Sequence, residues 1–549
     1  MKIFARYLVW LRQHFNYFGL LFALVFFCLS LTPSLLPRVW LLQGLVSGVS
    51  VAVGYGLGFL ASLIVRKLVR KEPKKLTKAR AWQGLVVAGV LFIFFFSYLS
   101  FNWQQETRRL VGTAPADGFH LLGVILTTLL IALLLTLIFR LVRLTFLFLK
   151  KQLLRFISPA LAYTIAAVLV SFLVIFVVNG VLFENFVKVA NQAFSVNNDT
   201  TTPGVEQPTT PFVSGSKDSL ISWDSLGLKG RDFVSRTTPL PELEKFNNTK
   251  PLQPIRLYAG IESADSAQGR ADLVIKEIER THAMDRKVLL VVTSTGSGWV
   301  NNNPVSSLEY MYNGDTATVA TQYSFLPSWL SFLVDADKAK EAGRAMINSV
   351  YEVWSKLPKE SRPKLLVYGE SLGSFGSESA FSGIADMQSR TDGILLVGPV
   401  FSNQLHREFT ADREQGSLER LPVYDSGAAV RFAAEPTDLD HPMTTWTNPR
   451  IVYLQHATDP IVWWSGRLLF RKPDWLKEPR GTDVLPNMTW YPVVTFAQVS
   501  VDLMFSTGYP GHGHAYGSKA TDVWAKIVPP ANWTTEKTSQ LKKIIGEEQ

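Results

Sequence analysis

Long apolar runs fill the first third of the chain. Before residue 185, five stretches each approach the ~20 residues that a helix needs to cross the hydrocarbon core of a bilayer. They cover residues 18–36, 41–65, 82–101, 119–139 and 160–183, and no later segment reaches that length. The pattern predicts a five-helix transmembrane domain over residues 1–184.

A different pattern begins at residue 255, where short runs rich in Val, Ile and Leu alternate with helical periodicity. Continuously apolar strands are typical of a parallel sheet that helices cover on both faces. Residues 255–549 are therefore expected to form an α/β domain with a mostly parallel sheet, and residues 185–254, rich in Asn, Thr, Ser and Pro, a polar linker. Strands are expected at 255–259, 287–293, 364–369, 393–398 and 450–455, and helices at 267–282, 335–357, 374–388 and 519–527.

Composition and charge agree with this division. The 549 residues are 47% hydrophobic and only 18% charged, which excludes an intrinsically disordered chain. Residues 1–160 hold 19 of the 55 Lys and Arg residues but only 3 of the 45 Asp and Glu residues. The net charge of +10 therefore comes from loops that flank the membrane. Since residues 161–549 are mildly acidic, we expect no nucleic-acid partner.

The basic residues also predict an orientation, because Lys and Arg are retained on the cytoplasmic side of a membrane. The N-terminal segment carries Lys2, Arg6 and Arg12, and eight basic residues lie in the loop from residue 66 to residue 80. Both should be cytoplasmic, so five crossings would place everything after residue 183 outside the cytoplasm. Pro33 and Pro37 interrupt the end of the first stretch, and losing that crossing would place both termini on one side.

A candidate nucleophile follows the expected strand at 364–369. The chain there reads Gly369-Glu370-Ser371-Leu372-Gly373, a G-x-S-x-G motif with a strand before it and a helix after it. Such a motif forms a tight turn that exposes the serine hydroxyl, and its glycines avoid clashes with the neighbouring strand and helix. We interpret Ser371 as a nucleophile; the alternative is an ordinary glycine-rich start of a helix.

A serine nucleophile needs a base to take its proton and an acid to orient that base. Asp459 follows the expected strand at 450–455 and is the candidate acid, although an aspartate before a proline is also common in turns. The base should come after it, which leaves His512 and His514, and we favour His512 slightly. These two histidines could instead bind a metal, but no thiolate or third ligand is evident nearby, so we expect no metal.

The acyl-enzyme oxyanion also needs hydrogen-bond donors. One is expected at the backbone N–H of Leu372 and the other in the glycine-rich loop after the strand at 287–293, at Thr295, Gly296 or Ser297. This loop matches neither the dinucleotide-binding nor the P-loop pattern, and we expect no cofactor.

Aromatic residues are frequent in the same loops. Most large rings pack in protein cores, but the apolar run over 323–333 could form a lid or a membrane-facing entrance suited to an acyl chain. The candidates for substrate contact are Trp299, Tyr323, Trp329, Trp463 and Trp464.

Six runs of residues carry a resemblance to a known family. They are LTPSLLPR at 31–38, GSGWV at 296–300, QYSFLPSW at 322–329, YGESLG at 368–373, DPIVWW at 459–464 and GHGH at 511–514. With them the chain resembles, over nearly its whole length, the bacterial membrane-anchored α/β-hydrolase family. That resemblance implies a multi-helix membrane domain joined to a serine α/β-hydrolase domain in a bacterial cell membrane. It supports Ser371, Asp459 and the two histidines as catalytic residues, and it supplies no substrate.

The sequence therefore predicts a membrane-anchored serine hydrolase that cleaves an ester or thioester of a lipid-like or acylated cell-envelope substrate. An envelope acyltransferase would use the same acyl-enzyme and pass it to another acceptor. A non-catalytic scaffold that keeps the fold is the further alternative.

Overall fold

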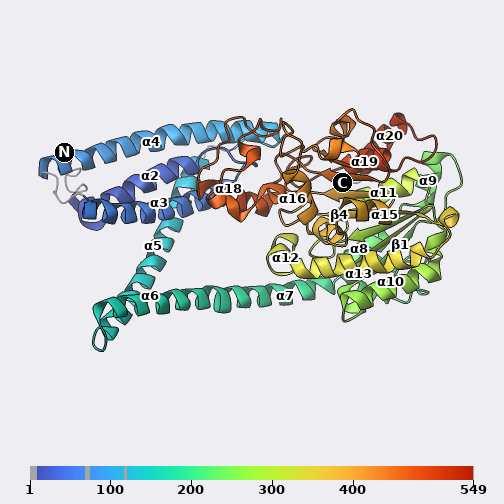
Figure 1. The fold of residues 1–549 in the computed structure, drawn as a ribbon, viewed down its shortest axis with the longest axis horizontal. Coiled ribbons are helices and arrows are strands. Elements are labelled where there is room, and N and C mark those ends of the chain that lie inside the picture. The colour runs from blue at the N-terminus through green and yellow to red at the C-terminus, as the bar shows by residue number, and fades with distance from the viewer. Residues whose placement is uncertain (1–8, 69–74, 117–119, 548–549) are drawn as a thin grey trace. The chain divides into compact units, whose positions relative to one another are not determined.

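The computed structural model describes residues 9–68, 75–116 and 120–547 (Figure 1). The chain divides into two compact units. Unit 1 comprises Met1–Val187 and Ser465–Phe505, and unit 2 comprises Lys188–Trp464 and Ser506–Gln549. Ser465–Phe505 thus belongs to the helical unit, although it lies inside the range expected for the catalytic domain. Lys2 and Arg6, used above for the orientation, lie outside the described residues.

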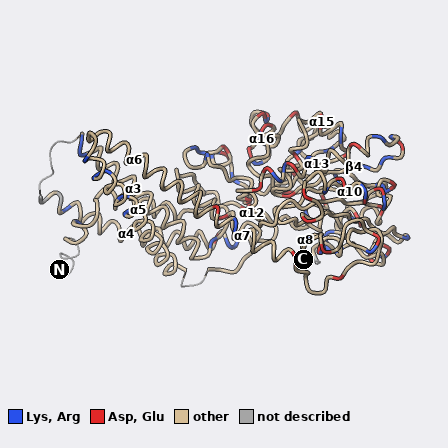
Figure 2. Tube along the Cα trace, turned by 90° about the horizontal axis from the view of Figure 1, so that it is seen from below, with Lys and Arg blue, Asp and Glu red and all other residues tan. Residues whose placement is uncertain are grey.

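Unit 1 is built from long apolar helices. Among the described residues, four helices are long and apolar enough to cross a membrane: Trp40–Leu68, Ala79–Leu110, His120–Leu153 and Pro159–Asn198. Charged residues are sparse along their central parts (Figure 2). The helices are α2 (Tyr17–Ser30), α3 (Trp40–Leu68), α4 (Lys75–Leu110), α5 (His120–Leu153) and α6 (Pro159–Ile175), which continues through the π-helical η1 (Phe176–Phe183) into α7 (Glu184–Asn198).

Four of the five expected stretches form helices long and apolar enough to cross a membrane, and the first expected stretch is a shorter helix. Helix α2 has 14 residues and ends at Ser30. At 1.5 Å per residue it spans about 21 Å, less than the ~30 Å of a hydrocarbon core. Pro33 and Pro37 follow closely, and a proline removes a backbone donor and disfavours helical geometry in the residue before it. The expected run over 18–36 therefore cannot continue as one helix.

A buried ion pair joins Ser465–Phe505 to the rest of unit 1. Arg38 Nε lies 2.8 Å from Asp502 Oδ1, and the two side chains are 1% and 0% exposed. Ser34 donates to the other carboxylate oxygen of Asp502, and Gln498 donates to the carbonyl oxygen of Thr32 at 2.9 Å. Because buried charges are tolerated only when paired and hydrogen-bonded, these contacts anchor α18 (Val494–Asp502) and the following η10 (Leu503–Phe505) within unit 1.

Unit 2 contains a seven-stranded, entirely parallel sheet in the order β1-β3-β2-β4-β5-β7-β6. All five expected strands are present. Two further strands escaped prediction because β3 alternates Thr with small residues and β6 is only four residues long and contains a buried arginine, Arg431. The strands are β1 (Ile255–Ala259), β2 (Val288–Thr293), β3 (Thr316–Thr321), β4 (Lys364–Glu370), β5 (Gly393–Val397), β6 (Val430–Ala433) and β7 (Arg450–Leu454).

Helices cover both faces of this sheet, which confirms the predicted α/β fold. Figure 1 shows α10 (Ala267–Thr281) and α13 (Ala336–Ser355) on one side of the strands and α11 (Asn302–Met311), α19 (Lys519–Ile527) and α20 (Thr535–Glu547) on the other. The helix expected over 374–388 is two helices, α14 (Leu372–Glu378) and α15 (Ile384–Arg390), with Gly383 before the second. The shorter helices are α12 (Ser328–Val334), α14 (Leu372–Glu378), α15 (Ile384–Arg390), α16 (Gln404–Ala411) and α17 (Pro460–Trp463).

The region expected as a polar linker is partly helical. Helix α7 occupies its start, and α8 (Gly227–Ser235) and α9 (Leu240–Asn247) follow. Phe233 of α8 and Leu243 of α9 are buried in the main hydrophobic core of unit 2. These two apolar side chains lie among many polar residues, so the composition of the segment concealed its packing.

Candidate active site

Ser371 lies in a sharp turn between β4 and α14. Its backbone has φ 56° and ψ −124°, a conformation that is strained for any residue with a side chain. A Cβ added at Gly369 would lie 2.4 Å from the carbonyl oxygen of Gly373, and one added at Gly373 would lie 2.2 Å from that of Thr293. Both positions of the motif therefore require glycine, and the turn has the geometry of a nucleophile elbow.

Asp459 and His514 form a buried pair. His514 Nδ1 lies 2.7 Å from Asp459 Oδ2, and the two side chains are 5% and 0% exposed. The other carboxylate oxygen accepts the backbone N–H of Ile461 at 2.9 Å, at the start of α17. His512, which the sequence favoured slightly, lies outside this pair and is half-buried. The geometry therefore favours His514 over His512 as the histidine that Asp459 orients.

Gly398, just after β5, brings His514 beside the elbow. A Cβ added at Gly398 would lie 2.2 Å from His514 Cε1, so only glycine leaves room for the ring. Val397, the residue before Gly398, accepts the backbone N–H of Ser371 at its carbonyl oxygen, at 2.9 Å. His514 Nε2 is buried and, within the described part of the chain, has no hydrogen-bond partner. The ring nitrogen that a general base would use to accept a proton is thus not engaged in a hydrogen bond with the described residues.

The two charges of the pair shift each other's pKa. Burial disfavours protonated His514, but the Asp459 carboxylate outweighs it and holds the pKa of His514 above its ordinary value; Glu370 acts in the same direction. Burial also opposes ionised Asp459, yet His514 and the donors around the carboxylate hold its pKa below the usual range. The arrangement thus stabilises an imidazolium next to a carboxylate, as proton abstraction from a serine requires.

Tyr516 is a further member of this cluster. Its hydroxyl donates to Asp459 Oδ2 at 2.7 Å and accepts the backbone N–H of His456 at 3.2 Å. The rings of Tyr516 and His456 stack with centroids 4.1 Å apart. Lys519 Nζ lies 2.7 Å from His456 Nε2 and 2.7 Å from Glu435 Oε1, so His456 links this cluster to an exposed carboxylate. No motif pointed to Tyr516 in the sequence.

Glu370, next to the candidate nucleophile, connects the elbow to the loop after β2. Its Oε2 accepts hydrogen bonds from the Tyr368 hydroxyl at 2.6 Å and from Asn301 Nδ2 at 2.9 Å, and the residue is only 6% exposed. Asn301 caps α11, at the end of the glycine-rich loop. The glutamate of the motif, for which the sequence indicated no role, thus connects two of the expected catalytic segments.

The glycine-rich loop is pinned at several backbone atoms. The N–H of Thr295 donates to the carbonyl oxygen of Trp299 at 3.0 Å, and that of Gly298 donates to the carbonyl oxygen of Thr295 at 2.9 Å. The Thr295 amide is therefore engaged within the loop, contrary to its expected role as an oxyanion donor. Of the expected donors, this leaves the amides of Gly296 and Ser297 in the loop and that of Leu372 at the start of α14.

The expected substrate-contacting aromatics differ in exposure. Tyr323 and Trp463 are buried, and Trp463 Nε1 donates to the carbonyl oxygen of His456, so both pack in the interior. Trp299 is 38% exposed. The side chain of Trp329 lies outside the described part of the structure. Trp464 is half-buried.

Trp464 belongs to an aromatic cluster with Phe332 of α12 and Phe401, which follows β5. The ring centroids of Trp464 lie 5.2 Å from Phe401 and 6.0 Å from Phe332, and those of the two phenylalanines lie 5.6 Å apart. All three are half-buried. Phe332 also packs against a buried cluster that includes Leu372, the residue after the candidate nucleophile. An apolar wall thus lies next to the elbow.

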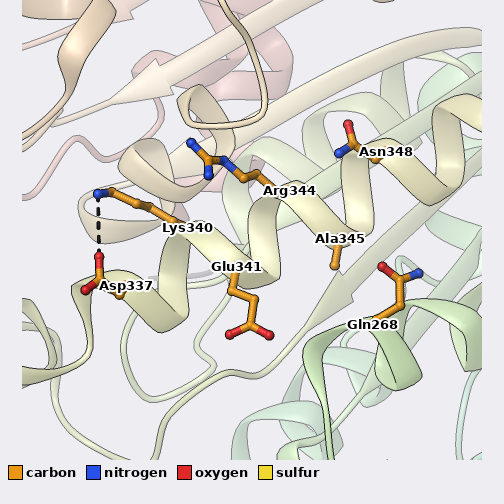
Figure 3. Close-up of a pocket in the computed structure, with 7 residues that line it drawn as sticks. All are labelled: Gln268, Asp337, Lys340, Glu341, Arg344, Ala345 and Asn348. Atoms are coloured by element: carbon orange, nitrogen blue, oxygen red, sulfur yellow. Dashed lines mark ion pairs between the residues drawn. The ribbon is translucent and has the colours of Figure 1, made fainter.

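A separate cleft lies at the surface between α10 and α13 (Figure 3). Its side chains are mostly charged or amide-bearing, and Lys340 pairs with Asp337 at 3.5 Å. None of the expected site residues lines it. The lining residues are Gln268, Asp337, Lys340, Glu341, Arg344, Ala345 and Asn348.

Family comparisons agree with both halves of the chain. Residues 255–541 match the model of an alpha/beta-hydrolase family, and residues 31–238 match the model of the N-terminal region of an alpha/beta-hydrolase family. No curated protein and no solved structure matches the chain.

Proposed function

The chain belongs to this alpha/beta-hydrolase family, and on that premise we propose that it is a membrane-anchored serine hydrolase acting through an acyl-enzyme. The observation that carries the proposal is the strained Ser371 elbow beside a buried Asp459–His514 pair whose Nε2 has no partner among the described residues. A structural serine in a helix start would need neither the strain nor the buried ion pair.

In the proposed reaction, Ser371 Oγ attacks the carbonyl carbon of an ester or thioester while His514 Nε2 takes the hydroxyl proton. Asp459 orients the imidazole and stabilises its positive charge. The amide of Leu372, together with that of Gly296 or Ser297, binds the oxyanion. His514 then protonates the leaving group, and water, deprotonated by the same histidine, releases the acyl group and restores Ser371.

The proposed substrate carries an acyl chain, either in a lipid or in an acylated component of the cell envelope. The cluster of Phe332, Phe401 and Trp464 beside the elbow offers apolar and aromatic surface where a sugar or a charged peptide would need polar groups. Membrane helices in the same chain would keep the enzyme at its lipid source.

We further propose that unit 2 lies outside the cytoplasm and the N-terminus inside it, in a bacterial cell membrane. The basic loop that follows α3 favours the cytoplasmic side. Helix α2 runs antiparallel to α3: Ser30 donates to Ser47 at 2.8 Å, and Asn16 donates to Ser62 at 3.0 Å. The start of α2 thus lies beside the end of α3 that enters the basic loop. Although α2 alone is shorter than a hydrocarbon core, this pairing favours the same, cytoplasmic side for the N-terminus and the basic loop, and the three candidate spans that follow the loop then lead to unit 2 outside. Reporter fusions at the N-terminus and after Gly204 would test this, and a cytoplasmic signal after Gly204 would refute it.

The proposed activity is tested by labelling the detergent-purified full chain with a fluorophosphonate, which reacts with activated serines. We expect labelling of the wild type and none of Ser371→Ala. A folded wild type that does not react would favour the scaffold alternative. Product analysis with an acyl ester, with and without an alcohol acceptor, then separates hydrolysis from acyl transfer.

A further inference from the structure

The last candidate membrane helix ends in a buried asparagine, Asn198, whose side chain fills a space beside a glycine. Residues Pro159–Asn198 form one continuous helix of 40 residues, and its final residue, Asn198, is 6% exposed, whereas Asn197 is exposed. The carbonyl oxygen of Asn198 accepts a hydrogen bond from Arg231 at 2.8 Å. A Cβ added at Gly227, where φ is 69°, would lie 2.5 Å from the Asn198 carboxamide. The glycine therefore leaves the space that this side chain fills.

The partner of Asn198 is Gln322, which directly follows β3 and is 1% exposed. Gln322 Nε2 lies 3.1 Å from Asn198 Oδ1, 3.1 Å from the carbonyl oxygen of Ser297 and 3.0 Å from that of Ser324. Its Oε1 accepts the backbone N–H of Ile261 at 3.2 Å. One carboxamide thus joins the end of the membrane helix, the glycine-rich loop and the start of the apolar segment over 323–333.

The hydrogen bond from Gln322 to the carbonyl of Ser297 fixes one end of the Ser297–Gly298 peptide group, and a second hydrogen bond fixes its other end. The carbonyl of Ser297 and the N–H of Gly298 belong to the same planar peptide group. Gln322 holds the carbonyl, and the N–H donates to Thr295. The next carbonyl, that of Gly298, accepts the Tyr258 hydroxyl at 2.7 Å. With these atoms fixed, the orientation of the preceding amides, those of Gly296 and Ser297, is restricted.

We propose that Gln322, braced by Asn198, is a positioning residue for the oxyanion loop, so that the end of the last membrane helix supports the catalytic machinery. This inference rests on the proposed function. Oxyanion donors act only when they lie in hydrogen-bond range of the developing charge, and loss of one such donor lowers kcat by about 10²–10³. A loosened loop should therefore lower kcat more than it raises KM, because the lost contacts form in the transition state.

The test compares variants of the full-length protein in detergent, with kcat and KM for an acyl ester as the readout. We expect Asn198→Ala to lower kcat about 10-fold. Gln322→Glu replaces the donor by an oxygen that faces the three acceptor oxygens of Asn198, Ser297 and Ser324, and we expect it to lower kcat about 100-fold. Asn198→Asp keeps the acceptor for Gln322 Nε2 and should retain most of the activity. Asn197→Ala is the matched control on the exposed side of the same helix end and should equal the wild type.

A second readout keeps this inference separable from the proposed activity. Hydrogen exchange of the backbone amides over 294–299 should be faster in Asn198→Ala and Gln322→Glu than in the wild type and Asn197→Ala. Unchanged exchange, or an unchanged kcat in both buried variants of an active enzyme, would overturn the inference. Failure of the wild type to react with a fluorophosphonate would refute the proposed activity, while the exchange measurement would still decide whether the brace holds the loop.

Discussion

His514 Nδ1 lies 2.7 Å from Asp459 Oδ2, while His512, two residues earlier, lies outside this pair. The difference runs against the slight preference for His512 drawn from the sequence. Both histidines lie in one short glycine-rich loop after the candidate acid, and both are compatible with the order Ser-Asp-His. The buried carboxylate thus favours His514 as the base of the proposed reaction.

Replacing the two histidines one at a time should therefore lower kcat strongly in one variant and little in the other. We expect His514→Ala to lower kcat about 10⁴-fold or more, since a triad without its base retains little activity. His512→Ala should stay within about 10-fold of the wild type. Steady-state kinetics on an acyl ester measure both. An inactive His512→Ala beside an active His514→Ala would refute the assignment.

The pH dependence of kcat/KM should reflect the raised pKa of His514. The base works only when neutral, so activity should rise with pH, with an apparent pKa above the ordinary histidine value of ~6.5. Asp459→Asn removes the carboxylate that raises this pKa, and its remaining activity should rise at lower pH than that of the wild type. A rise at the same pH in both proteins would contradict the proposed cause.

The stability of the folded protein should depend on pH through the ionisation of Asp459 and His514. Because folding raises the pKa of His514, its protonation stabilises the folded state fully below the unfolded pKa, and this contribution is lost as pH rises through the folded pKa. Asp459, with a lowered pKa, contributes above its unfolded pKa and loses that contribution in acid. His514→Ala should therefore flatten the pH dependence of the melting temperature near neutrality. An unchanged profile would show that the pair is not ionised as we infer.

Tyr516 should act through Asp459 without touching the substrate. Tyr516→Phe removes one hydrogen bond to the carboxylate, a loss of roughly 1 kcal/mol. We expect a kcat about 3–10-fold lower with KM unchanged. Tyr491→Phe, in the segment that belongs to unit 1, is the control and should match the wild type. A wild-type kcat in Tyr516→Phe would show that this hydroxyl does not act on catalysis through Asp459.

The aromatic cluster predicts selectivity for the acyl chain. Trp464→Ala removes the ring that contacts both Phe332 and Phe401. We expect kcat/KM for long-chain esters to fall about 10-fold or more relative to that for acetyl esters, because only the long chain would use this apolar surface. A competition assay with esters of graded chain length measures the ratio. Equal losses for all chain lengths would remove the cluster from the binding site.

The sequence predicted the fold well because the strong signals are local. Five continuous apolar strands and the glycine motif around Ser371 are readable from neighbouring residues. The two missed strands lack that signal, since β3 is built from Thr and Ala around one Val and β6 is short. The roles proposed for Tyr516, Gln322 and Asn198 depend on contacts between residues far apart in the chain, for which a single sequence has no periodic pattern.

The membrane region shows the same limit. Hydropathy found the apolar stretch around α2 but not the point where its helix ends, which the prolines after Ser30 determine. It also gave no sign that Ser465–Phe505 belongs with these helices, because the contacts that join them, such as the buried ion pair between Arg38 and Asp502, link residues far apart in the chain. Residues more than four hundred positions apart form this ion pair.

The position of the 465–505 segment in unit 1 has a further consequence for handling the protein. The chain passes between the two units three times, after Val187, after Trp464 and after Phe505. A single protease cut near residue 187 therefore cannot release a free hydrolase. The C-terminal product would still carry the 465–505 segment, which the contacts of Asp502 and Gln498 hold on the helices. Removing the N-terminal helices alone would strip Asp502 of Arg38 and leave apolar side chains of α18 open to water, so such a truncated chain should aggregate rather than behave as a soluble enzyme.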